Sequence, residues 1–124
     1  MTAESSRALV VLTTCANAEE ASALATALVE QRLAACVSSL ADVTSTYRWQ
    51  GRLQHDRESL LVIKTTEERF PAVERMIQAR SSYELPEVLA VPVQVGSAAY
   101  LSWLAAEVEG QSSPAPQSDV RTEA

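Results

Sequence analysis

The sequence is poor in the residues that build phosphate loops, disulfide scaffolds and metal cages. Its 124 residues include 3 glycines, 2 cysteines and 1 histidine. The glycines, at positions 51, 96 and 110, form no glycine-rich loop, which argues against P-loop and Rossmann nucleotide chemistry. Cys15 and Cys36 have no C-x-x-C spacing and are too few for a disulfide scaffold. We therefore expect reduced thiols and a cytoplasmic protein.

Basic residues and catalytic motifs are also scarce. Ten Lys and Arg against 16 Asp and Glu give a net charge of −6, which argues against a nucleic-acid partner. The apolar run at residues 8–12 is too short for a signal peptide or a membrane span, so no membrane partner is expected. No G-x-S-x-G motif is present, and His55, beside Asp56, is expected to be exposed to solvent. These features predict that the protein is not an enzyme.

The chain has the length of one domain with polar ends. Residues 1–6 are polar and predict a flexible N-terminus. Residues 110–124 are rich in Ser, Pro and Gln and predict a disordered tail. The folded domain is therefore expected to span residues 7–109.

Hydrophobic periodicity in residues 7–109 alternates between that of strands and that of helices. Asn17, followed by Glu20, predicts a capped helix start, and Pro92 predicts an edge or bulged strand. The expected order is a strand at 9–14, a helix from 17, strands at 34–50 and 52–66, a helix at 67–80, a strand at 88–95 and a short helix ending at 108. This order predicts an α+β fold of the ferredoxin-like split βαβ type, with an antiparallel sheet and an added C-terminal helix.

Both faces of the expected sheet are apolar. In residues 60–63, for example, Leu61 and Ile63 alternate with Leu60 and Val62. Burial of apolar surface contributes about 25 cal/mol per Å². If five such side chains of about 60 Å² each stayed in water, the fold would lose about 7 kcal/mol of this stabilisation. The short last helix is too small to cover the second face. We therefore expect another subunit to cover it.

The two central strands are long for a domain of this size. At about 3.3 Å per residue, residues 34–50 and 52–66 would each extend about 50 Å. The hairpin must bend, break or overhang, and an overhanging edge that carries Tyr47 and Trp49 would pair with another subunit. The alternative is a kink near Ala41 and Asp42 that packs everything within one chain.

Five segments carry a family resemblance. They are LVEQRLAACV at 28–37, S-x-Y-x-W-x-G at 45–51, IKTT at 63–66, YELPEV at 83–88 and G-x-x-x-YLSWL at 96–104. Together and in this order, they resemble the CutA divalent-cation tolerance family. The resemblance implies a ferredoxin-like subunit in a homotrimer, with clefts between subunits and a non-enzymatic role in tolerance of divalent metal ions, copper in particular.

The resemblance also implies copper or another divalent cation as a ligand. The family usually reads H-P-Y-E where this chain has Ser81, Ser82, Tyr83 and Glu84, so Ser81 replaces the histidine proposed to bind copper. Cys36 keeps the family's cysteine and is the candidate metal ligand. Its apolar neighbours are equally typical of a cysteine that packs as a small hydrophobic residue.

Aromatic residues point to a second kind of site. We expect a cleft between subunits that holds a small ligand, lined by Tyr47, Trp49, Tyr83 and Trp103 with Lys64 and Glu84 as its charged pair. The alternative is that these aromatics only pack in an interface. A signalling or scaffold trimer resembling the PII proteins, with a small metabolite or a protein partner in these clefts, is the second functional hypothesis.

Overall fold

The computed structural model describes residues 6–109. The expected tail at 110–124, and residues 1–5 of the expected N-terminal segment, lie outside the described residues. The elements are β1 (Ala8–Cys15), α1 (Ala18–Glu30), β2 (Cys36–Trp49), β3 (Arg52–Thr66), α2 (Phe70–Arg80), β4 (Leu89–Pro92) and α3 (Ala98–Glu107). This order confirms the predicted α+β fold.

The four strands form one antiparallel sheet in the order β2-β3-β1-β4. The edge strand β4 pairs with β1 from Leu89 to Pro92, which confirms the edge position expected for Pro92. The predicted strand at 88–95 was too long, because β4 spans only four residues, and Val93 adds one backbone hydrogen bond from its N–H to the Ala8 carbonyl at 3.0 Å.

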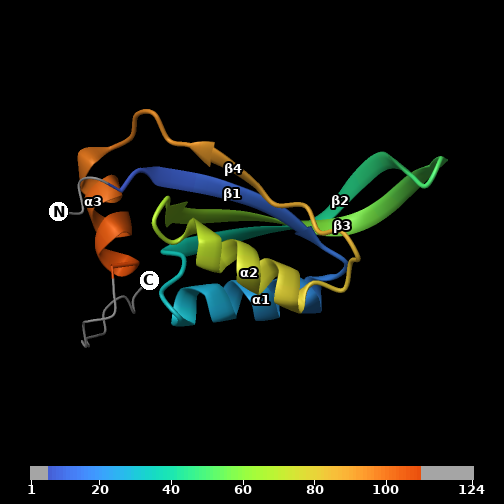
Figure 1. Cartoon of the computed structure of the whole chain (residues 1–124), viewed down its shortest axis with the longest axis horizontal. Helices are drawn as coiled ribbons and strands as arrows, with labels where there is room; N and C mark the ends of the chain where they lie inside the picture. The colour runs from blue at the N-terminus through green and yellow to red at the C-terminus, as the bar shows by residue number, and fades with distance from the viewer. Residues whose placement is uncertain (1–5, 110–124) are drawn as a thin grey trace.

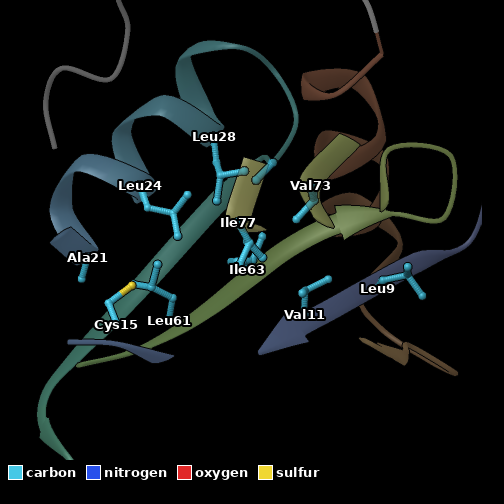
Figure 2. Close-up of a cluster of buried hydrophobic side chains, with 11 residues drawn as sticks. Leu9, Val11, Cys15, Ala21, Leu24, Leu28, Leu61, Ile63, Val73 and Ile77 are labelled. Carbon is cyan, nitrogen blue, oxygen red and sulfur yellow. The ribbon is translucent and has the colours of Figure 1, made fainter. Parts of the chain in front are cut away.

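The core lies between one face of the sheet and the helices α1 and α2 (Figure 1). Figure 2 shows strand side chains pointing toward side chains of both helices. The largest fully buried residues of this cluster are Leu28, Leu61, Ile63, Ile77, Val11 and Val73. Alternate residues of β1 and β3 therefore supply one layer of the core, as the sequence pattern predicts.

Local hydrogen bonds set the helix starts. Asn17 caps α1, since its side-chain oxygen accepts from the Glu20 backbone N–H at 2.8 Å, which confirms the predicted cap. Helix α2 begins at Phe70, three residues later than predicted, because the Glu67 backbone N–H donates to the Arg7 carbonyl at 2.8 Å and so stays with the sheet. No helix within residues 6–109 is long and apolar enough to cross a membrane.

The opposite face of the sheet, which we call the open face, carries no helix layer from α1 or α2. Helix α3 packs against one end of the sheet, where Leu104 and Val108 contact Ala35 and Ala8. Much of the rest of the face is apolar and at least partly exposed, with Lys64 and Ser38 as a hydrogen-bonded polar pair among the apolar residues. Val10, Leu12 and Val62 are half-buried, and Leu40, Leu89 and Val91 are 47%, 56% and 52% exposed. The prediction of an apolar second face is confirmed, as is the limited reach of the last helix.

Strands β2 and β3 continue beyond the end of β1 as a two-stranded arm (Figure 1). The pairing register shifts between Leu40 and Val43, and Asp42 adopts a positive φ of 60° there. The hairpin therefore both bends at the predicted position and overhangs. The kink does not fold the arm back onto its own sheet, contrary to the single-chain alternative (Figure 1).

Candidate functional site

A cavity of about 730 Å³ lies at the corner where the arm leaves the sheet. Strand β1 ends at Cys15, opposite Ser59, and the following β3 residue toward the arm is Glu58. The loop between α2 and β4 passes the end of β1 (Figure 1), and its Tyr83 reaches Glu58. Strand β2 and this loop line the cavity mainly with Ser45, Tyr47, Trp49, Tyr83, Glu84 and Glu87, and Glu58 contributes from β3.

Glu58 and Tyr83 form the central hydrogen bond of the cavity. The Tyr83 hydroxyl donates to Glu58 Oε2 at 2.6 Å, and Glu58 is only 8% exposed. Burial, followed by this hydrogen bond, raises the pKa of Tyr83 above its ordinary value. The Tyr83 hydroxyl therefore stays protonated at neutral pH and remains the donor.

A second tyrosine is held in the same way on the arm. The Tyr47 hydroxyl donates to Asp56 Oδ2, which lies on the neighbouring strand. This hydrogen bond is the main cause that raises the pKa of Tyr47. The bond fixes the Tyr47 ring at the cavity wall, and the residue is 39% exposed.

The loop that carries Tyr83 is tied to the helices by serines. The Ser81 backbone N–H donates to the Ile77 carbonyl at 3.0 Å, and Ser81 Oγ accepts from the Tyr83 backbone N–H at 3.0 Å. Ser82 donates its backbone N–H and its hydroxyl to the carboxylate of Glu20, at 3.0 and 2.9 Å. Both serines are thus used to position the loop where the family's histidine motif is expected.

Four of the predicted cleft residues meet at this cavity, namely Tyr47, Trp49, Tyr83 and Glu84. Lys64 does not line it: the residue pairs with Cys36 and Val10 on the open face, near the end of the sheet that contacts α3, and its Nζ donates to Ser38 Oγ at 2.8 Å. Trp103 lies on α3, with its ring centroid 5.4 Å from that of Tyr100. A shared cleft for all six residues stays a prediction about neighbouring subunits.

The expected lining of the cleft did not include the two other carboxylates of the cavity, Glu58 and Glu87. A signal for Glu58 was present, because this charged residue stands two positions before the apolar strand centre that begins at Leu60. A charge at the border of a buried strand is uncommon unless it has a partner. Glu87 gave no comparable signal.

The cysteines do not assemble a metal site within one chain. No three His, Cys, Asp or Glu side chains within residues 6–109 group to hold a metal ion. Cys36 is half-buried and lies near the Tyr100 hydroxyl, whose pKa is raised by burial and then by Cys36. Cys15, a β1 residue rather than part of the segment after the strand, faces the core.

Cys15 is unsuited to bind a metal at neutral pH. Burial, together with the charges of Glu20 and Glu58, raises the pKa of its thiol from 9.0 to about 11. The thiolate is the form that binds metals, and this thiol is protonated at neutral pH. The donor set of a single chain therefore does not fit copper, which prefers two or more converging thiolate or imidazole ligands.

His55 lies outside the cavity on the exposed side of the arm, as predicted. Its Nδ1 lies 3.2 Å from Thr46 Oγ1, and the residue is exposed. A catalytic base requires a nucleophile or a bound substrate within reach. Within residues 6–109, the hydroxyl of Thr46 is the side-chain hydrogen-bond partner of His55, and His55 does not line the cavity.

Comparison with known protein families shows to which family the chain belongs. The family model described as "CutA1 divalent ion tolerance protein" matches residues 9–107. The chain belongs to the CutA1 family. The match spans every element from β1 to α3 and confirms the resemblance seen in the five sequence segments.

Individual members of the CutA1 family agree in sequence and in structure. "Divalent-cation tolerance protein CutA" of Thermus thermophilus is 46% identical over 95 residues, which is 77% of this chain and 92% of that protein. "Protein CutA" of Mus musculus is 42% identical over 91 residues, 73% of this chain but only 51% of that protein. The crystal structure of CutA from Xylella fastidiosa has a TM-score of 0.81 at 38% identity, covering 83% of this chain and 99% of that one.

Proposed function

We propose that the protein is a homotrimeric, non-enzymatic member of the CutA1 family with a role in the tolerance of divalent metal ions, copper in particular. Membership of the family carries this proposal, since the bacterial relative at 46% identity is named for divalent-cation tolerance. The role as a whole is tested by growth of cells that lack this gene in graded copper, zinc and cobalt. Tolerance restored by the wild-type chain is expected, and unchanged growth would contradict it.

The open face supports the trimer. Leu40, Leu89 and Val91 are about half exposed in one chain, next to the half-buried Val62. Contiguous apolar surface of this kind marks an interaction site. A homo-oligomer buries such a face and so gains the free energy of apolar burial that a single chain lacks. Light scattering tests the proposal directly, with an expected mass of three chains of 13.4 kDa.

Metal binding, in this proposal, uses Cys36 from more than one subunit. Within the described residues, a single chain gathers no group of three His, Cys, Asp or Glu side chains around a metal position. A trimer supplies three copies of each ligand, which is the arrangement a soft ion such as Cu(I) requires. The proposal therefore ties copper binding to assembly.

Calorimetry with Cu(I), Cu(II) and Zn(II) tests this assignment. We expect Cys36→Ser to abolish binding, while the matched variant Cys15→Ser retains it, because Cys15 is buried and protonated. Equal binding by wild type and Cys36→Ser would remove Cys36 as the ligand.

The cavity favours a second candidate function, a PII-like trimer that binds a small metabolite or a protein partner. Its volume and its mixture of aromatic and polar walls match those of small-molecule sites. Thermal-shift screening of metabolites distinguishes this function from metal response, since a ligand of the folded state raises the melting temperature. A rise with a metabolite but not with metals would favour it.

A further inference from the structure

The charges around the cavity all have one sign. Within one chain, Glu58, Glu84 and Glu87 line it, and none of its lining residues in the described range 6–109 is Lys, Arg or His. The lysine expected to accompany Glu84 lies elsewhere, bonded to Ser38. A cavity with three carboxylates and no basic residue attracts cations and repels phosphates and carboxylates.

Glu58 gives an independent indication of a cationic ligand. It is 8% exposed, and Tyr83 donates to its Oε2. In the part of the chain that the structure describes, its Oε1 accepts no hydrogen bond and no basic side chain forms an ion pair with it. A buried carboxylate is costly unless a cation or further donors approach it. The free oxygen therefore suits an ammonium group that enters the cavity.

The walls of the cavity suit an organic cation better than a bare metal ion. Tyr47, Trp49 and Tyr83 border it, and the faces of such rings attract ammonium groups and pack against methylenes. A hard divalent ion would need about six oxygen ligands around one point. Glu58 is buried, whereas Glu84 and Glu87 are exposed, so the charges are distributed between the interior and the rim.

We propose that this cavity binds an aliphatic diamine or triamine. One ammonium group pairs with Glu58, the methylene chain lies against the aromatic walls, and a second ammonium group reaches the rim carboxylates Glu84 and Glu87. The proposal rests on the ligand-binding role proposed above for this cavity and names the chemical class of its ligand.

Calorimetric titration with spermidine at 150 mM salt tests the proposal. We expect saturable binding with one site per chain. Glu58→Gln, which keeps the shape and removes the charge, should weaken it at least tenfold, and so should Trp49→Leu, which removes an aromatic wall. Glu30→Gln on α1 removes the same charge outside the cavity and should leave the affinity unchanged.

Two controls make the result specific. Mg²⁺ carries positive charge without methylenes, so it should not displace spermidine at equal concentration. Uncharged N,N′-diacetylputrescine should not bind. Equal weakening by Glu58→Gln and Glu30→Gln would indicate general attraction to an acidic protein and would overturn the proposal. A crystal structure in which a basic side chain of a second copy pairs with Glu58 would overturn it as well.

Failure of this inference is distinguishable from failure of the proposed function. Spermidine that does not bind to a protein with trimer mass and with copper binding through Cys36 rejects the amine ligand alone. A monomeric protein without effect on metal tolerance rejects the proposed function, whatever the titration with spermidine gives. Circular dichroism of Glu58→Gln and Trp49→Leu verifies that both variants are folded.

Discussion

The two faces of the sheet carry similar apolar side chains but bury them by different means. Leu61 and Ile63 are fully buried under α1 and α2, whereas their neighbour Val62 is only half-buried on the open face. The covered face is completed within one chain. The open face, in our proposal, is completed only by other subunits. Strand alternation alone therefore specifies two interfaces, one for folding and one for assembly.

The largest effect is expected from a charge on the open face, which tests whether this face joins subunits. Leu89→Asp places a carboxylate among apolar neighbours, and an unpaired charge in an apolar interface costs several kcal/mol. We expect the mass in light scattering to fall from three chains to one. Val29→Asp, at an exposed position on α1, is the control and should keep the trimer. A Leu89→Asp protein that stays trimeric would show that the open face does not join subunits.

The next effect concerns the covered face. Leu61→Ala leaves a void among fully buried side chains and should lower the free energy of unfolding by about 2–5 kcal/mol. Urea denaturation at one fixed protein concentration measures the loss. Val29→Ala, at an exposed helical position, should change the free energy by no more than about 0.5 kcal/mol. Similar losses in both variants would contradict the division between core and surface.

A smaller loss of stability is expected from removing the N-cap of α1, one of the two helices that cover the sheet. Asn17→Ala removes the side-chain acceptor of the Glu20 N–H and should cost about 1 kcal/mol of stability. Thermal denaturation measures the change. Asn17→Asp keeps a side-chain oxygen at the cap and should behave like the wild type. A loss of the same size in Asn17→Asp would show that the cap is not the cause.

The smallest effect at neutral pH comes from the thiol in the core. The pKa of Cys15 is about 11 in the folded chain against an ordinary value of 9.0. The folded state thus binds the proton more tightly, so its contribution to stability is complete below pH 9 and is lost as pH rises through about 11. Denaturation between these pH values should show a shallower decline in Cys15→Ala than in wild type. Identical declines would contradict the burial effect.

Much of the fold could be predicted from local pattern. Asn17 with Glu20 marked the first helix, and the alternation around Leu61 marked both faces of the sheet. The start of α2 was missed because the Glu67 N–H bonds to Arg7, a contact between residues distant in sequence. The length of β4 was missed because its pairing depends on β1 rather than on its own composition.

The candidate site was predictable only in part. Tyr47, Trp49, Tyr83 and Glu84 come together because the arm and the loop after α2 meet at the end of β1. Lys64 lies six residues along β3 from Glu58, which corresponds to about 20 Å in an extended strand. Position along a strand, not residue type, separates it from the cavity. The sequence gives this separation, but the level along β3 at which the cavity lies becomes known only from the register and the place where β1 ends.

The bulge at Ala41 and Asp42 shifts the phase of strand β2. Leu40 pairs with Leu60 and Val43 with Glu58, so one extra residue is inserted on the β2 side. Because of this extra residue, Ser45, Tyr47 and Trp49 lie on the same side of the arm as Glu58. If the same residues paired without the bulge, Thr44, Thr46 and Arg48 would stand on that side instead, so the bulge gives the cavity its aromatic wall.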